Sequence, residues 1–224
     1  MKEKRLIYLH VPKCAGRTLK TLLFNNYDRH YEINNMMKLR EWKQPVFKDV
    51  DLIFGHIVYC YVKDFDRYKK ATILRDPIER TISQYNHFMN MTTRVVKPGE
   101  MKEKNITFKN FLETNDMNLK LWVNAYCTFF GDEDREQYNI QTFFKRAMDT
   151  ICNLDFVGIY EQLDETVNRM KKKFGLKGEY STTGITPAKF KYTLTDDDIE
   201  MANKVLKPDI NLYKLALQRF EGGN

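Results

Sequence analysis

The sequence predicts one α/β domain spanning residues 1–224, in which helices flank a central parallel sheet in three layers. Three observations lead to this prediction. Short apolar runs recur along the chain and have the character of buried strands, at 6–9, 51–55, 71–74 and 155–160. Segments with apolar residues three and four positions apart, the spacing of an amphipathic helix, alternate with these runs. The connections are short, and neither an internal repeat nor a linker divides the chain, which favours a single parallel-sheet domain.

The first two helices follow from local patterns. Leu19, Leu22 and Leu23, with Tyr27 as a further member, predict a helix directly after a loop at 11–16. A second helix is expected after the third apolar run, and its buried face is marked by Ile78, Ile82, Tyr85 and Met89.

The start of that second helix has a recognisable capping pattern. Asp76 is expected to be the N-cap residue, with Pro77 at the favoured first helical position. Glu79 is expected to complete a capping box, in which the two side chains bond reciprocally to the backbone.

The remaining chain predicts further helices separated by two long polar segments. The helices are expected at 107–115, 117–130, 137–152, 161–174, after an N-cap at Thr195, and from Pro208 to about Gly222. Residues 92–105 and 175–190 lack periodicity, so we expect loops there, the first of them mobile.

The first loop has the composition of an anion-binding turn. It follows the first strand, and open α/β sheets bind ligands beyond the carboxyl ends of their strands. Its small residues, which let backbone N–H groups approach a phosphate, are Cys14, Ala15 and Gly16. Its cations and its hydroxyl donor are Lys13, Arg17 and Thr18. The lysine precedes the glycine, unlike in the Gly-Lys-Ser/Thr loop of nucleoside triphosphatases, and an ordinary turn with a chance lysine is the alternative.

A second anchor is expected at the end of the third strand. Arg75 lies there, and Ser83 follows about two turns into the next helix, so a guanidinium and a hydroxyl are placed to hold one phosphate. Asp76 already serves the N–H groups of that helix and repels an anion, so side chains must hold the phosphate. The alternative is that Arg75 and Arg80 form ion pairs with Asp76 or Glu79.

Together these segments resemble the paired PAPS-binding segments of the sulfotransferase superfamily, in its carbohydrate sulfotransferase-like branch (PAPS is 3′-phosphoadenosine 5′-phosphosulfate). The segment that is similar to the 5′-phosphosulfate site matches at Pro12, Lys13, Gly16 and Thr18. The segment that is similar to the 3′-phosphate site matches at Arg75, Asp76, Pro77, Arg80, Ser83 and Tyr85. Residues 156–161 and 209–216 look like further stretches of the carbohydrate branch.

The resemblance implies a P-loop-like fold and an enzyme that transfers sulfonate from PAPS, as co-substrate, to a hydroxyl of a carbohydrate or similar small molecule, without a metal. It implies that Lys13 stabilises the leaving group, while the backbone from Cys14 to Thr18 holds the nucleotide with Arg75 and Ser83. Arg17 departs from the pattern, because a small hydroxyl residue is common at its position. The loop at 175–191 is expected to cover the nucleotide, although its residues cannot be aligned individually.

The proposed general base is His56, in the sequence Phe-Gly-His-Ile at the end of the second strand. An ordinary histidine pKa of about 6.5 suits proton abstraction near neutral pH. This Gly-His also resembles the catalytic-histidine segment of the uronyl and related carbohydrate sulfotransferases. A hydrogen-bonded structural histidine is the alternative, and Glu161 is the main rival base. His87 is expected near the acceptor, His10 is expected to pack, and His30 is expected in a polar loop.

Composition limits the classes of partner. The net charge of +7 and the basic isoelectric point favour anionic partners such as nucleotides or acidic glycans, and no nucleic-acid-binding motif is present. Cys14, Cys60, Cys127 and Cys152 lack zinc-site spacing and are expected to be reduced thiols. No signal peptide or membrane-spanning run is present, so a cytoplasmic protein with no membrane partner is expected.

Two other functions are alternatives to sulfonate transfer. A kinase-like phosphotransferase would show the Gly-Lys-Ser/Thr order and magnesium-binding carboxylates. A non-catalytic anion- or glycan-binding protein would not need the lysine, arginine, serine and histidine that are present together. The segments 26–50 and 90–118 are expected to line the acceptor side. The sequence identifies neither the acceptor nor the oligomeric state.

Overall fold

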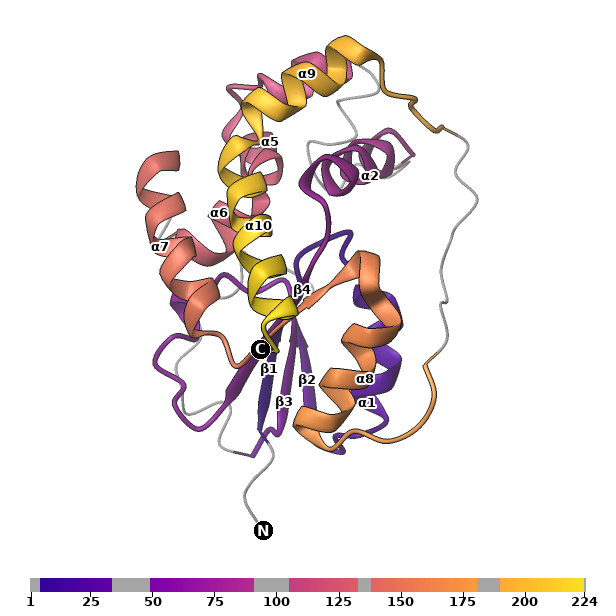
Figure 1. Ribbon diagram of the computed structural model, residues 1–224, viewed down its shortest axis with the longest axis vertical. Helices are drawn as coiled ribbons and strands as arrows, with labels where there is room; N and C mark the ends of the chain where they lie inside the picture. Colours follow the sequence, from indigo (N-terminus) through magenta and orange to yellow (C-terminus); the bar gives the residue numbers. More distant parts are fainter. Residues whose placement is uncertain (1–4, 34–48, 91–104, 133–137, 181–189, 224) are drawn as a thin grey trace.

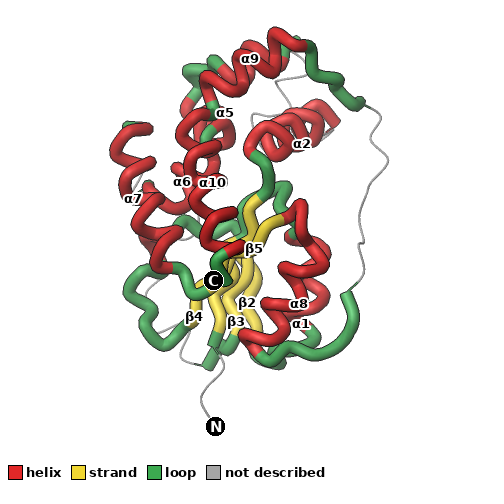
Figure 2. The backbone as a smooth tube through the Cα atoms, viewed as in Figure 1, coloured by secondary structure: helices red, strands yellow, loops and turns green. Residues whose placement is uncertain are grey.

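One parallel sheet forms the centre of the molecule. The computed structural model describes residues 5–33, 49–90, 105–132, 138–180 and 190–223. The strands pair in the order β2-β3-β1-β4-β5, all in parallel. They are β1 (Leu6–Leu9), β2 (His30–Ile33), β3 (Leu52–Gly55), β4 (Lys69–Leu74) and β5 (Phe156–Ile159). Figure 2 shows them enclosed between helices, which confirms the α/β prediction.

Helices account for most of the remaining described chain. The α-helices are α1 (Gly16–Phe24), α2 (Pro77–Asn90), α4 (Phe108–Leu112), α5 (Met117–Val123), α6 (Ala125–Gly131), α7 (Ile140–Asn153), α8 (Leu163–Phe174), α9 (Asp196–Val205) and α10 (Lys207–Glu221). Two 3₁₀ helices, η3 (Tyr59–Tyr61) and η4 (Tyr160–Gln162), follow β3 and β5. No helix among the described segments combines the length and hydropathy needed to cross a bilayer.

The two faces of the sheet bury separate clusters of side chains. Successive residues of a strand point to opposite faces, so Leu6 and Tyr8 pack against α1 and α8, while Ile7 and Leu9 pack against α6, α7 and α10. All four residues have no exposed surface. A strand buried on both faces is a continuous apolar run, which explains why the sequence predicts β1.

A third cluster of helices lies beyond the carboxyl ends of the strands, where Figure 1 shows α2, α5 and α9. Tyr85 and Phe88 of α2 pack there against Phe108 and Phe111 of α4 and Ala202 of α9. This packing holds α2, which carries the predicted second anchor, over the edge of the sheet.

The strand β2 was not predicted, because its segment was assigned to a polar loop. His30 and Tyr31 are exposed, so the segment has no apolar run to identify it. Pairing with β3, from His30 opposite Leu52 to Ile33 opposite Gly55, nevertheless makes it the edge strand. The ring of His30 stacks on Phe24, with centroids 4.0 Å apart.

The prediction of one helix over 117–130 is also wrong, because the chain divides at Asn124 into α5 and α6. Asp209 of α10 accepts hydrogen bonds from the backbone N–H groups of Tyr126 and Cys127, each at 2.9 Å. A fully buried carboxylate from a distant segment thus caps the start of α6, and burial raises the pKa of Asp209 to about 6.

The other helix predictions hold with shifted ends. Thr195 caps α9 and forms a capping box with Asp198. The helix expected over 161–174 begins with the 3₁₀ turn η4. Most of the predicted loops at 92–105 and 175–190 lies outside the described residues, at 92–104 and 181–189.

Replacing Asp209 with alanine should lower the free energy of unfolding by about 2–4 kcal/mol, because two buried N–H groups lose their acceptor. Urea denaturation measures this loss. Asp196→Ala, in the exposed first turn of α9, is the control and should cost less than about 1 kcal/mol. An equal loss of unfolding free energy in the two variants would contradict a stabilising role for the Asp209 cap of α6.

Candidate active site

The two predicted anchors meet because β1 and β4 are neighbours. Tyr8 lies opposite Ala71 in the register of these strands, so the loops that follow them leave the same edge of the sheet. After β1 the chain enters α1, which packs on one face of the sheet. After β4 it enters α2 and later reaches α6 and α7, which pack on the other face. Strands whose connections diverge in this way leave a crevice in which α/β proteins bind ligands.

The β1–α1 loop turns sharply before the helix begins. Lys13 and Ala15 have positive φ angles of 72° and 57°, in the left-handed region. Ala15 caps α1 without a side-chain hydrogen bond, and the first turn contains no acidic residue. A left-handed residue followed by helical backbone forms a concavity of N–H groups, to which the helix dipole adds positive charge.

Close packing explains the glycine in this loop. A Cβ atom on Gly16 would lie 1.8 Å from Nε2 of His10, so the imidazole ring occupies the space that a side chain would need. Cys14 is fully buried, with its Sγ 3.7 Å from the Tyr126 hydroxyl. Thr18 is buried and Arg17 is exposed.

Arg75 is held at both ends. Its backbone N–H donates to the Tyr126 hydroxyl at 2.9 Å, and that hydroxyl donates to the Arg75 carbonyl. Its Nη2 pairs with Glu79 at 3.1 Å, and its guanidinium lies 4.8 Å from the ring centre of Tyr160. Ser83 follows Glu79 by one turn on the same face of α2. The structure thus brings Arg75 to the face that carries Ser83 but pairs it with Glu79, which was the alternative prediction.

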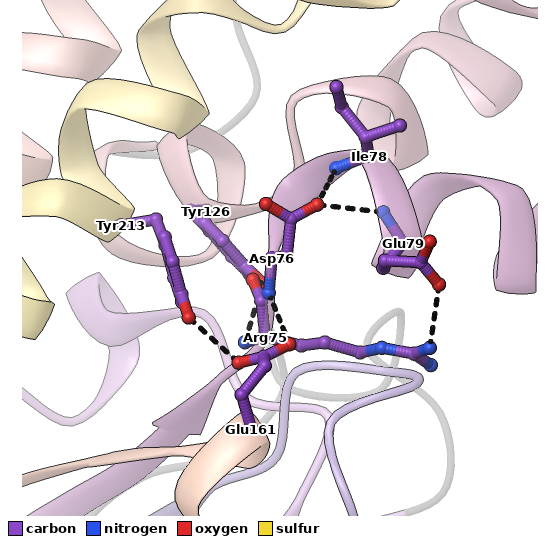
Figure 3. Close-up of polar contacts among 7 residues, drawn as sticks. All are labelled: Arg75, Asp76, Ile78, Glu79, Tyr126, Glu161 and Tyr213. Atoms are coloured by element: carbon purple, nitrogen blue, oxygen red, sulfur yellow. Dashed lines mark hydrogen bonds and ion pairs between the residues drawn. The ribbon is translucent and has the colours of Figure 1, made fainter. Parts of the chain in front are cut away.

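The start of α2 has the predicted N-cap but not the predicted capping box (Figure 3). Oδ1 of Asp76 accepts from the N–H groups of Ile78 and Glu79, at 2.9 and 3.0 Å, which confirms the N-cap. The reciprocal bond of a capping box is missing, because the N–H of Asp76 donates to Glu161 at 2.9 Å. Glu79 faces Arg75 instead, so the predicted box is wrong.

Several cations converge behind the two loops. The pKa of Lys13 is lowered first by burial and then by the charges of Arg17, Arg75 and Arg80. Arg80 is fully buried; its Nη2 donates to the carbonyl of Trp122, while its Nε and Nη1 have no partner within the described chain. Nε of Arg75 is likewise buried without a partner there. Buried cationic donors left unsatisfied are costly and favour an anionic ligand.

His56 is oriented by a backbone carbonyl. Its Nδ1 lies 3.1 Å from the carbonyl oxygen of His10, which only accepts, so Nδ1 carries a proton and the neutral ring keeps its lone pair on Nε2. The rings of His10 and His56 stack with centroids 4.7 Å apart. Burial lowers the pKa of His56, and it lowers that of His10 to about 3 with smaller contributions from His56 and Lys13. Both rings are therefore neutral at pH 7.

The other candidate bases occupy different surroundings. The pKa of His87 is lowered by burial and then by Lys13 and Arg17, which places it beside the first loop. Both carboxylate oxygens of Glu161 accept hydrogen bonds, Oε1 from Asp76 and Oε2 from the hydroxyl of Tyr213 at 2.7 Å.

Sequence reasoning missed Glu32, whose charge raises the pKa of His56 and partly offsets the effect of burial. Glu32 lies opposite Phe54 in the register of β2 and β3, and His56 directly follows the end of β3 at Gly55. The Glu32 carboxylate pairs with Lys20 at 2.6 and 2.8 Å. Glu32 is a residue of β2, so a prediction of that strand would have placed it beside β3 and near His56.

Comparison with known proteins assigns this chain to a family. The model of the sulfotransferase family matches residues 1–214. The chain belongs to the sulfotransferase family. The sulfotransferase from Alicyclobacillus acidocaldarius shares the fold, with a TM-score of 0.53 at 13% identity over 93% of each chain. A mouse sulfotransferase complexed with PAP (3′-phosphoadenosine 5′-phosphate) superposes with a TM-score of 0.40 at 11% identity, over 91% of this chain and 63% of that one. No curated protein matches the sequence.

Membership confirms the prediction of a sulfotransferase enzyme with a P-loop-like fold and of PAPS-dependent sulfonate transfer as its reaction class. The kinase-like phosphotransferase and the non-catalytic binding protein were the alternatives, and the family match supports neither of them. The carbohydrate branch is not shown by these matches. The site assignments in this sulfotransferase remain predictions, as does the cover formed by the 175–191 loop, because residues 181–189 lie outside the described chain.

The contact between Gly16 and His10 can be tested in the sulfotransferase by a double-mutant cycle. Gly16→Ala should lower the free energy of unfolding by about 1–3 kcal/mol, because the new methyl group displaces a packed ring. In a His10→Ala background the added cost should fall by at least about 0.5 kcal/mol. Gly222→Ala, where the new Cβ would lie 3.3 Å from the carbonyl oxygen of Gln218, is the control. Strict additivity in urea denaturation would contradict the contact.

Proposed function

We propose that this enzyme transfers sulfonate from PAPS to a hydroxyl of a carbohydrate or similar small molecule, with the nucleotide held between the β1–α1 loop and α2. The convergence of Lys13, Arg17, Arg75 and Arg80 at the carboxyl ends of β1 and β4 carries the proposal. These cations repel one another, and a nucleotide with phosphate groups on both the 3′ and the 5′ position of its ribose would relieve that repulsion at two separate points.

The residues present fit such a ligand. Lys13 and the backbone from Cys14 to Thr18 would hold the 5′-phosphosulfate at the uncapped start of α1. Arg75 and Ser83 would hold the 3′-phosphate, since Nε of the guanidinium has no partner among the described residues. Glu79 must then release Arg75, and its exposed side chain can turn towards water at little cost.

The chain's own groups supply the proton transfer and the charge stabilisation. PAPS supplies an activated sulfonate: the acceptor oxygen forms the new S–O bond while the bridging S–O bond breaks and its electron pair stays on the departing phosphate. His56 would take the acceptor proton on Nε2, with Nδ1 anchored to the His10 carbonyl. Glu32 would stabilise the imidazolium that forms. Lys13 would stabilise negative charge on the leaving group. Its pKa is lowered first by burial and then by the charges of Arg17, Arg75 and Arg80.

The choice of a carbohydrate acceptor rests on the resemblance of the Gly-His segment and of residues 156–161 and 209–216 to the carbohydrate branch. The segments expected to line the acceptor side, 26–50 and 90–118, lie partly outside the described residues, at 34–48 and 91–104. A panel of sugars that differ in charge would therefore identify the acceptor more directly than the fold does.

Thermal unfolding with PAP, AMP and ATP–magnesium tests nucleotide recognition. PAP at a hundred times its dissociation constant should add about 2.7 kcal/mol of stability and raise the midpoint by about 5–10 °C. AMP, which lacks the 3′-phosphate, should give a smaller shift. Lys13→Ala and Arg75→Ala should abolish most of the PAP shift, whereas Lys172→Ala on the exposed surface of α8 should not. A shift with ATP–magnesium alone would contradict the proposal.

The pH profile of sulfonate transfer tests His56. The neutral ring is the active form and burial lowers its pKa, so kcat/KM should be level around pH 7 and fall on acidification with a midpoint below 6.5. His56→Ala should lower kcat by about 10²–10⁴-fold and leave PAP affinity nearly unchanged. PAP release from PAPS with the sugar panel measures both. Full turnover in the variant would rule out His56 as the base.

A further inference from the structure

Glu161 is exposed at the rim of the site, and each of its carboxylate oxygens already accepts a hydrogen bond from the protein. One oxygen accepts from the N–H of Asp76 at 2.9 Å, and the other accepts from the Tyr213 hydroxyl at 2.7 Å (Figure 3). Burial and the neighbouring carboxylate raise the pKa of Tyr213, so its hydroxyl stays protonated and remains a donor. These two hydrogen bonds connect the Glu161 carboxylate to the backbone of Asp76 and to Tyr213 of α10, which indicates a structural role.

That role concerns the turn between β4 and α2. The N–H and the carbonyl of Arg75 both bond to the Tyr126 hydroxyl, and the next N–H along the chain bonds to Glu161. The side chain of Asp76 is already used to cap α2. Three successive main-chain groups are therefore held by side chains from α6 and η4, and η4 is in turn tied to α10 through Tyr213.

The orientation of the Arg75 side chain depends on this turn. Its guanidinium extends from a backbone fixed on both sides of the Cα atom and lies over the ring of Tyr160, the neighbour of Glu161. An arginine fork recognises phosphate through two directed N–H bonds, so a small rotation of its backbone would spoil the alignment.

We propose that Glu161, oriented by Tyr213, is a positioning residue that aligns Arg75 for a 3′-phosphate and is not the proton acceptor. This inference rests on the proposed PAPS site. It assigns the preference for a 3′-phosphorylated nucleotide to a hydrogen-bond relay that starts in α10 and reaches Arg75 without touching the ligand.

The test compares three variants by their affinity for PAP and for AMP. Glu161→Ala should weaken PAP binding about tenfold with little change for AMP, because only PAP uses the aligned arginine. Glu161→Gln keeps an oxygen for the Asp76 N–H, so its PAP affinity and its kcat should stay within about threefold of the parent enzyme. Tyr213→Phe, which removes one donor and leaves Glu161 in place, should weaken PAP binding by about threefold. If Glu161→Ala does not fold, the ratio of PAP to AMP affinity in Tyr213→Phe and the kcat of Glu161→Gln still test the inference.

Glu165→Ala provides the control, because Glu165 lies one turn along on α8 in an exposed ion pair with Arg169 and should leave the PAP-to-AMP ratio unchanged. Loss of turnover in Glu161→Gln with PAP affinity intact would overturn the inference and make Glu161 the base. Equal weakening of PAP and AMP by Glu161→Ala would also overturn it. A parent enzyme that does not prefer PAP to AMP would instead refute the proposed function, and the inference with it.

Discussion

The pairing of β1 with β4 is the constraint on which the rest of the molecule depends. It places two loops that are some sixty residues apart in sequence at the same edge of the sheet, one after Leu9 and one after Leu74. Both strands are buried on their two faces, so the pairing is held by the core and does not rely on the loops. The site can therefore carry strained and charged features that would be unstable on a less rigid support.

Those features oppose folding in the absence of an anion. Lys13 and Ala15 adopt left-handed backbone angles, and two nitrogens of the buried Arg80 guanidinium have no partner in the part of the chain that the structure describes. Each feature is destabilising on its own. Their gathering at one edge is typical of a binding site, where part of the stability of the fold is given up so that the ligand meets groups already in position. The capped turn at Asp76 and the buried carboxylate of Asp209 offset some of this loss nearby.

The sequence was sufficient wherever a signal was local. The strands β1, β3, β4 and β5 are apolar runs, and Asp76 and Thr195 are short-range caps, so each was predicted. The errors arose where the deciding partner is distant. Nothing near Asn124 indicates that Asp209 will cap α6, and nothing near Glu79 indicates that Glu161 will take its place at Asp76. β2 is a strand only because β3 lies beside it, and Glu32 was overlooked for the same reason. The contacts of Arg75 with Tyr126 and Tyr160 join segments that no spacing rule connects.

The position of α10 in the order of synthesis has a consequence for the newly made chain. A ribosome completes all five strands once it has passed Ile159, but the residues that cap α6 and orient Glu161 belong to Lys207–Glu221. Arg219 of the same helix also binds the carbonyls of Ile151 and Leu154, just before β5. The nascent sheet can thus form before the partners of α6 and Glu161 exist, so the candidate site is complete only when α10 has left the exit tunnel and docked.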